Sequence, residues 1–173
     1  MLAIRQSPLP SGTLLERYRL DGSYTDCYCM DVPRRISFTE YVSAFYTTPL
    51  FKIERGILAI LARRPSSDAG ASALAAGSAS NFAAWTVEGR ASDQLLLQDF
   101  LGRTRSWLMV TPIDRPTQSA TRLYFGSAVV PLSRSPKGTP SFGFAFHALH
   151  GFHHLYTRAL MRAALSKLMA VRQ

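Results

Sequence analysis

The sequence predicts an α+β fold in which a curved antiparallel sheet wraps around a long C-terminal helix. Residues 81–131 alternate apolar and polar side chains as strands do, whereas residues 141–172 repeat apolar positions at helical spacing. Only short turns bearing Gly or Pro divide the strand-like stretch. Because no helix separates these strands, we expect neighbouring strands to pair antiparallel.

The composition is that of a folded globular domain. The chain has 173 residues, of which 47% are hydrophobic and 18% charged, enough for one sizeable core. We expect residues 1–20 to form an N-terminal lead-in and residues 21–173 a single domain. The apolar runs are too short to span a bilayer. The N-terminus lacks a basic region followed by an apolar stretch, so a cytoplasmic location is expected.

The first strand is predicted over residues 22–31, which alternate apolar and polar side chains until Pro33 ends the pattern. Two short helices should follow this strand. At the start of the first helix, Ser37 can cap the free backbone amides, and Glu40 stands three residues later, as in a capping box.

The second short helix is predicted from Pro49, which suits a first helical turn, to Arg63. Residues 65–80 are rich in Ala, Ser and Gly, and we expect a mobile connection there, with a short alanine helix as the alternative. Antiparallel strands then follow over residues 81–88, 94–100, 105–112 and 120–130. A loop with three prolines connects the last of these strands to the final helix.

This order of elements resembles the helix-grip superfamily of START, birch-pollen-allergen and polyketide-cyclase proteins. Four stretches are similar to a bacterial family of unknown function within it: Tyr24-Thr25-Asp26, Asp93–Leu97, Leu123–Ser127 and His154–Leu160. The resemblance covers about residues 20–172 and implies a cavity for an apolar ligand between sheet and helix. Some members catalyse cyclisation, dehydration or aromatisation, so the fold leaves the activity open. Unlike this chain, most members show additional strands in the region of residues 65–80.

The net charge of +9 results from a shortage of acids, with 20 basic residues against 11 acidic ones. The longest basic clusters are the pairs Arg34-Arg35 and Arg63-Arg64, and no nucleic-acid-binding motif is present. Because a nucleic-acid binder usually concentrates its cations along the phosphates, this scatter argues against nucleic acid as a partner. Arginines at the ends of apolar helices would allow weak contact with an anionic membrane.

All four histidines fall in the predicted C-terminal helix. Spacings of three and four place His147, His150 and His154 on one stripe, a geometry that allows a shared metal. We expect this stripe to face solvent, because it lies opposite the helix's apolar side and continues into arginines. Cys27 and Cys29 have no second cysteine pair with which to hold zinc. We therefore predict neither a metal site nor a cofactor.

His153 flanks the apolar side of the same helix and can point toward the cavity. There it could act as a general base, or it could be a core-edge histidine bonded to a backbone carbonyl. Strand aromatics would supply contact area, while Gln98 and His153 would orient a polar group. The predicted ligand-binding residues are Trp85, Gln98, Trp107, Tyr124, His153 and Tyr156.

Three functional hypotheses follow. The first is binding of an apolar or amphipathic small molecule between sheet and helix. The second is a cyclase- or dehydratase-type enzyme in the same cavity, with His153 as general base and Tyr156 or Gln98 stabilising an oxyanion. The third is a homodimeric or membrane-surface interaction module, because both faces of strand 105–112 are apolar and a second copy could cover one of them. Phosphate-binding, dinucleotide and Gly-x-Ser-x-Gly motifs are absent.

Overall fold

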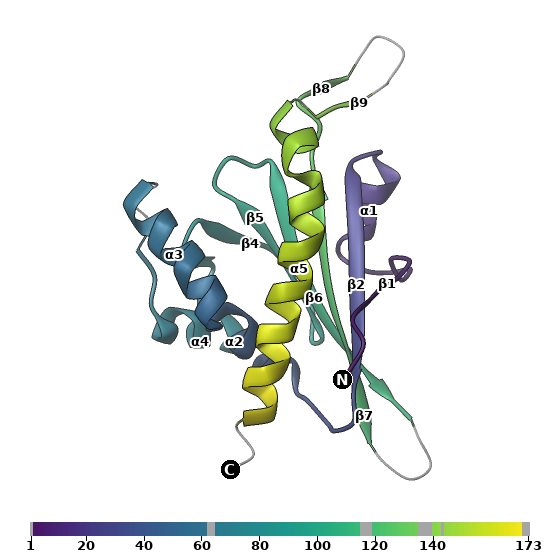
Figure 1. Cartoon of the computed structure of the whole chain (residues 1–173), viewed down its shortest axis with the longest axis vertical. Coiled ribbons are helices and arrows are strands. Elements are labelled where there is room, and N and C mark those ends of the chain that lie inside the picture. The colour runs from purple at the N-terminus through teal and green to yellow at the C-terminus, as the bar shows by residue number, and fades with distance from the viewer. Residues whose placement is uncertain (1, 62–64, 115–118, 135–139, 143, 171–173) are drawn as a thin grey trace.

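A computed structural model describes residues 2–61, 65–114, 119–134, 140–142 and 144–170. It contains a curved, fully antiparallel sheet of seven strands in the order β1-β2-β7-β6-β5-β4-β3. These strands are β1 (Arg5–Gln6), β2 (Tyr24–Val32), β3 (Asn81–Phe82), β4 (Trp85–Arg90), β5 (Gln94–Asp99), β6 (Thr104–Ile113) and β7 (Ala120–Val129). A small hairpin, β8 (Ser133–Arg134) and β9 (Pro140–Ser141), stands apart from the sheet (Figure 1).

The long helix α5 (Phe144–Ala170) crosses one face of the sheet (Figure 1). The predicted α+β class, with an antiparallel curved sheet and a C-terminal helix, is thereby confirmed. This arrangement is compatible with the helix-grip fold. We call the face toward α5 the inner face and the opposite one the outer face. None of the described helices combines the length and hydropathy that a bilayer span requires.

Between β2 and β3 the described chain forms three helices, where the sequence predicted two. They are α2 (Phe38–Tyr46), α3 (Pro49–Leu61) and α4 (Asp68–Ala76). Helix α4 occupies the stretch expected to be a mobile connection. Its ends are well defined, because Ser67 Oγ accepts a hydrogen bond from Gly70 N at 3.1 Å and Gly77 adopts a φ of 81° at the C-cap. The N-cap Ser67 and the C-cap Gly77 thus stabilise a helix in this segment, although its sequence is low in complexity.

Helix α2 fixes the position of the aromatic core. Ser37 Oγ accepts a hydrogen bond from Glu40 N at 3.1 Å and so caps the helix. The helix then buries Tyr41, Phe45 and Tyr46 against the inner face of the sheet, where Phe45 stacks on Phe125 with ring centroids 4.9 Å apart. These aromatic contacts place α2 beside the residues that later line the cavity.

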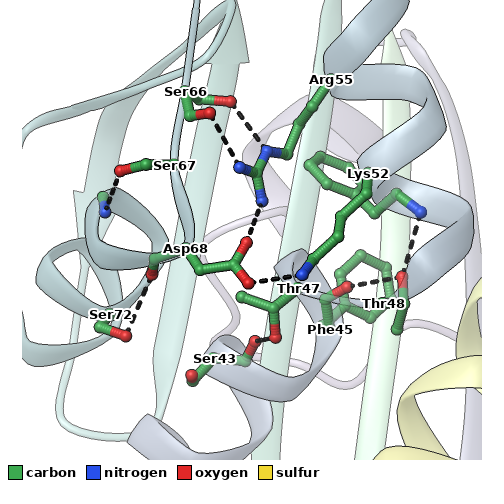
Figure 2. Close-up of polar contacts among 12 residues, drawn as sticks. Ser43, Phe45, Thr47, Thr48, Lys52, Arg55, Ser66, Ser67, Asp68 and Ser72 are labelled. Atoms are coloured by element: carbon green, nitrogen blue, oxygen red, sulfur yellow. Dashed lines mark hydrogen bonds and ion pairs between the residues drawn. The ribbon is translucent and has the colours of Figure 1, made fainter.

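An ion-pair cluster joins α3 to the start of α4 (Figure 2). The buried Arg55 guanidinium donates to Ser66 Oγ at 2.9 Å, to Ser66 O at 2.8 Å and to Asp68 Oδ1 at 2.8 Å. Lys52 Nζ binds the other oxygen of Asp68 at 2.5 Å. Every group in this cluster is used to hold the helices together, so we assign it a structural role.

The outer face of the sheet is covered by the N-terminal residues of the same chain. Leu15 and Tyr18, from the region around helix α1 (Glu16–Leu20), pack on Trp107, Tyr124 and their neighbours. The residues expected to be a lead-in thus form the edge strand β1 and a cover for the sheet. The apolar outer face of β6, which had suggested a second copy, is accounted for by this contact.

Buried polar groups seal this contact. The Arg105 guanidinium donates to Tyr18 Oη at 2.7 Å and pairs with Glu88. Close packing also explains a glycine in β7, because a Cβ atom on Gly126 would lie 2.8 Å from Asp26 O and 2.9 Å from the Trp107 ring. A side chain there would push the two strands or the indole apart.

Candidate functional site

A cavity of about 190 Å³ lies between the inner face of the sheet and α5. Its apolar lining comes from five elements, which are α2, α3, β4, β7 and α5. The apolar residues on it are Phe45, Phe51, Trp85, Phe125, Ala128, Val129, Tyr156 and Leu160. Ser127, His153 and Thr157 are among the polar residues on the same wall. A mostly aromatic cavity with a few polar groups is typical of a small-molecule site.

The polar part of the wall centres on Asp26, near the start of β2. Asp26 stands directly opposite Ser127 of β7 in the strand register. Its Oδ1 accepts hydrogen bonds from Ser127 N at 3.0 Å and Ser127 Oγ at 2.6 Å. From α5, His153 Nε2 lies 2.9 Å from Asp26 Oδ2 and 2.9 Å from Ser127 Oγ. Three residues far apart in the chain therefore meet at one point, which we call the Asp26 cluster.

Burial and charge compete at Asp26. Its side chain is only 1% exposed, against 33% for His153. Burial by itself raises the pKa of the Asp26 carboxyl, but contact with His153 and the two hydrogen bonds from Ser127 outweigh it and lower the pKa below the ordinary value. Asp26 is therefore a carboxylate at neutral pH. The pKa of Tyr24 is raised by burial and then by this negative charge.

The carboxylate determines where the protons of the cluster lie. An ionised Asp26 can only accept hydrogen bonds, so the two contacts of His153 Nε2, with Asp26 Oδ2 and Ser127 Oγ, are both favourable when this nitrogen carries a proton. The Ser127 hydroxyl gives its own proton to Asp26 Oδ1. In a serine-hydrolase triad, the carboxylate and the serine contact opposite nitrogens of the histidine. Here both contact Nε2, so the geometry does not activate Ser127 as a nucleophile.

The structure brings together three of the six predicted ligand-binding residues. Trp85, His153 and Tyr156 all line the cavity. His153 contacts two side chains, which differs from the alternative of a histidine bonded to a backbone carbonyl alone.

Gln98, Trp107 and Tyr124 are not on the cavity. Trp107 and Tyr124 pack together on the outer face with ring centroids 6.1 Å apart, and Trp107 Nε1 donates to Gln94 Oε1 at 3.0 Å. Gln98 follows the alternation of Leu96, which belongs to the same outer cluster. The alternation of β5, β6 and β7 showed which residues share a face, but both faces are apolar, so it did not show which face meets α5.

Sequence reasoning missed Asp26 and Ser127 as members of the site. One signal was available for Asp26, because it is an acid on the strand face that also carries Tyr24, Tyr28 and Met30. An acid there must be partnered if that face is buried. No comparable signal distinguishes Ser127 from the other small residues of its strand.

The histidine stripe does not behave as expected at His154. This residue is half-buried, and its Nδ1 makes a hydrogen bond with Tyr28 Oη of β2. The expected solvent exposure is therefore wrong for His154, because α5 turns two successive residues, His153 and His154, toward β2. The side chains of His147 and His150 lie outside the described part of the structure. Within the described part, no group of three or more His, Cys, Asp or Glu residues could hold a metal ion.

Comparisons of the chain with protein-family models, with curated proteins and with solved structures find no match.

Proposed function

We propose that this protein binds a small, mostly apolar molecule in the cavity between the sheet and α5. The observation that carries the proposal is the Asp26 cluster, an ionised carboxylate and a partly exposed histidine set in an aromatic wall. Polar groups placed in this way orient a ligand, while the aromatic side chains supply contact area. The likeness of the element order to the helix-grip superfamily supports the same proposal.

The volume of the cavity restricts the size of the ligand that can bind there. Its volume of about 190 Å³ is slightly larger than a cavity of about 150 Å³ that accepts benzene. It is smaller than the range of about 300–1,000 Å³ that holds drug-sized molecules. We therefore favour a ligand with a single ring and one polar substituent, such as a phenol or an aromatic ketone.

The two tryptophans of the chain allow a direct test, because Trp85 lines the cavity and Trp107 is buried on the outer face. In a Trp107→Phe variant, the fluorescence of Trp85 should change in a saturable manner when single-ring phenols or aromatic ketones are added. The matched Trp85→Phe variant, which retains only Trp107, should show no such change. Native mass spectrometry with solvent extraction would identify any molecule that purifies with the protein. A Trp85 signal that responds to none of the probes, together with empty purified protein, would contradict the proposal.

A second candidate is the cyclase- or dehydratase-type enzyme, and the contact between His153 and Asp26 favours it. With the Nε2 proton directed at the carboxylate, Nδ1 is the nitrogen that would act as general base, and Asp26 would stabilise the imidazolium formed. For a bound molecule that the wild type converts, His153→Gln should abolish conversion and leave its Kd within several-fold. Binding without conversion would leave the first candidate alone.

A further inference from the structure

Four strongly exposed apolar side chains gather at one end of the sheet. They belong to a set of seven exposed large hydrophobic residues in the described part of the chain. The exposed fractions are 71% for Leu20, 51% for Phe100, 66% for Leu101 and 60% for Leu132. We call these four residues the apolar tips. Isolated exposed apolar residues are ordinary on a protein surface. Four of them at one end of the sheet require an explanation.

The strand register shows that the apolar tips share one end of the sheet. Val129 at the end of β7 is paired with both Tyr24 at the start of β2 and Thr104 at the start of β6. Leu20 closes α1 just before β2, Phe100 and Leu101 form the turn before β6, and Leu132 follows β7. Figure 1 shows α1, the turn between β5 and β6, and the β8–β9 hairpin at the same end of the molecule.

Three of the four apolar tips have an arginine within two residues in the chain, and Phe100 has one three residues away. Arg19 precedes Leu20, Arg103 follows Leu101 and Arg134 follows Leu132. The acids of these turns are engaged locally, because Asp21 Oδ1 and Asp99 Oδ1 accept backbone hydrogen bonds at 2.9 Å and 2.6 Å.

We propose that this end of the molecule docks peripherally on an anionic membrane surface. The apolar tips would enter the boundary between headgroups and acyl chains, and the neighbouring arginines would contact the lipid phosphates. A membrane fits better than a protein partner, because the tips come from three separate turns and alternate with cations. The core of a protein interface is instead depleted of charge. This inference does not depend on whether the cavity holds a ligand.

Vesicle flotation of the full chain tests the inference. Vesicles of phosphatidylcholine alone are compared with vesicles containing roughly one quarter phosphatidylglycerol, at low and high salt. We expect binding to the anionic vesicles only, weakened by salt. The double substitution Phe100→Ser and Leu101→Ser should lower the partition coefficient at least about tenfold, because it removes the apolar area that enters the bilayer.

Ile53 provides a matched control. It is 64% exposed on α3, an element that contributes none of the apolar tips, and Ile53→Ser should bind the anionic vesicles as the wild type does. Leu132→Ser, on a different turn, is a second test variant whose loss of binding would not depend on how the double variant folds. Absence of wild-type binding, equal binding to neutral vesicles, or equal losses in the Ile53 and Leu132 variants would each overturn the inference.

Discussion

The two faces of the sheet each contain a largely buried charged pair, and the two pairs differ in how far their cationic partner is exposed. On the outer face, Arg105 and Glu88 are closed in with Tyr18 beneath the N-terminal residues. On the inner face, Asp26 pairs with His153, whose side chain remains 33% exposed. The outer pair fastens the N-terminal cover to the sheet, while the inner pair leaves His153 partly exposed on the cavity wall.

Packing differs between the faces in the same way. On the outer face, Trp107 is fully buried, and its indole N–H is satisfied by Gln94. On the inner face, Trp85 is only partly buried and borders the cavity. A close-packed region specifies the fold and tolerates little change, whereas an incompletely filled one leaves room for a ligand. The larger buried cluster lies on the inner face, so the contrast concerns the local packing of the two tryptophans, which is closed around Trp107 and open around Trp85.

The largest predicted effect is a contrast between the two tryptophans. Trp107→Ala should lower the free energy of unfolding by about 4 kcal/mol, because it opens a large cavity in a close-packed cluster. Trp85→Ala should lower it by only about 1–2 kcal/mol, since part of its side chain is exposed and borders an existing cavity. Urea denaturation of both variants measures the difference. Equal losses would remove the distinction between a sealed face and an open one.

A second prediction concerns the acid limb of stability. The pKa of Asp26 is lowered in the folded protein from its ordinary value of 3.8, so its contribution to stability is present above that pH. The contribution is lost as the pH falls below 3.8 and through the lower folded value. In Asp26→Asn the free energy of unfolding should therefore decline less steeply over this range. Glu16, Asp31 and Asp68, whose pKa values are also lowered, provide a background common to both proteins.

His153 gives this prediction a sharper form. His153→Gln removes the charge that opposes burial, so the pKa of Asp26 should rise, and carbon-13 NMR of the Asp26 carboxyl measures the change. The carboxyl of Asp31, which pairs with Arg122 and Arg5, should keep its titration in the same spectrum. If both carboxyls titrated as in the wild type, His153 would not be the partner that keeps Asp26 ionised.

Much of the architecture could be predicted from the sequence because its causes are local. The alternation in residues 81–131 and the helical spacing of residues 141–172 arise within single elements. For residues 65–80 a mobile connection was expected first and a helix only as the alternative, because the alanines of α4 form no clear apolar stripe. Ser67 and Gly77 are residue types that commonly begin and end a helix, and they were the available signal. The candidate site was harder to predict, because it needs the register of β2 on β7 to join Asp26 to Ser127, 101 residues away.

The smallest expected effect is at the two cysteines, which lie on the sealed outer face. Cys27 and Cys29 are free thiols with exposed fractions of 2% and 1%, and burial raises the pKa of Cys27 to about 12. Because the thiolate is the reactive form, a disulfide reagent at neutral pH should leave the native protein unmodified and its unfolding transition unchanged. In strong denaturant both thiols should react rapidly. If the thiols of the native protein react no faster than the whole protein unfolds, the outer face is closed in the folded state. Faster reaction would show that the N-terminal cover lifts locally, and Tyr18→Phe, which removes the hydroxyl bonded to Arg105, should then accelerate it.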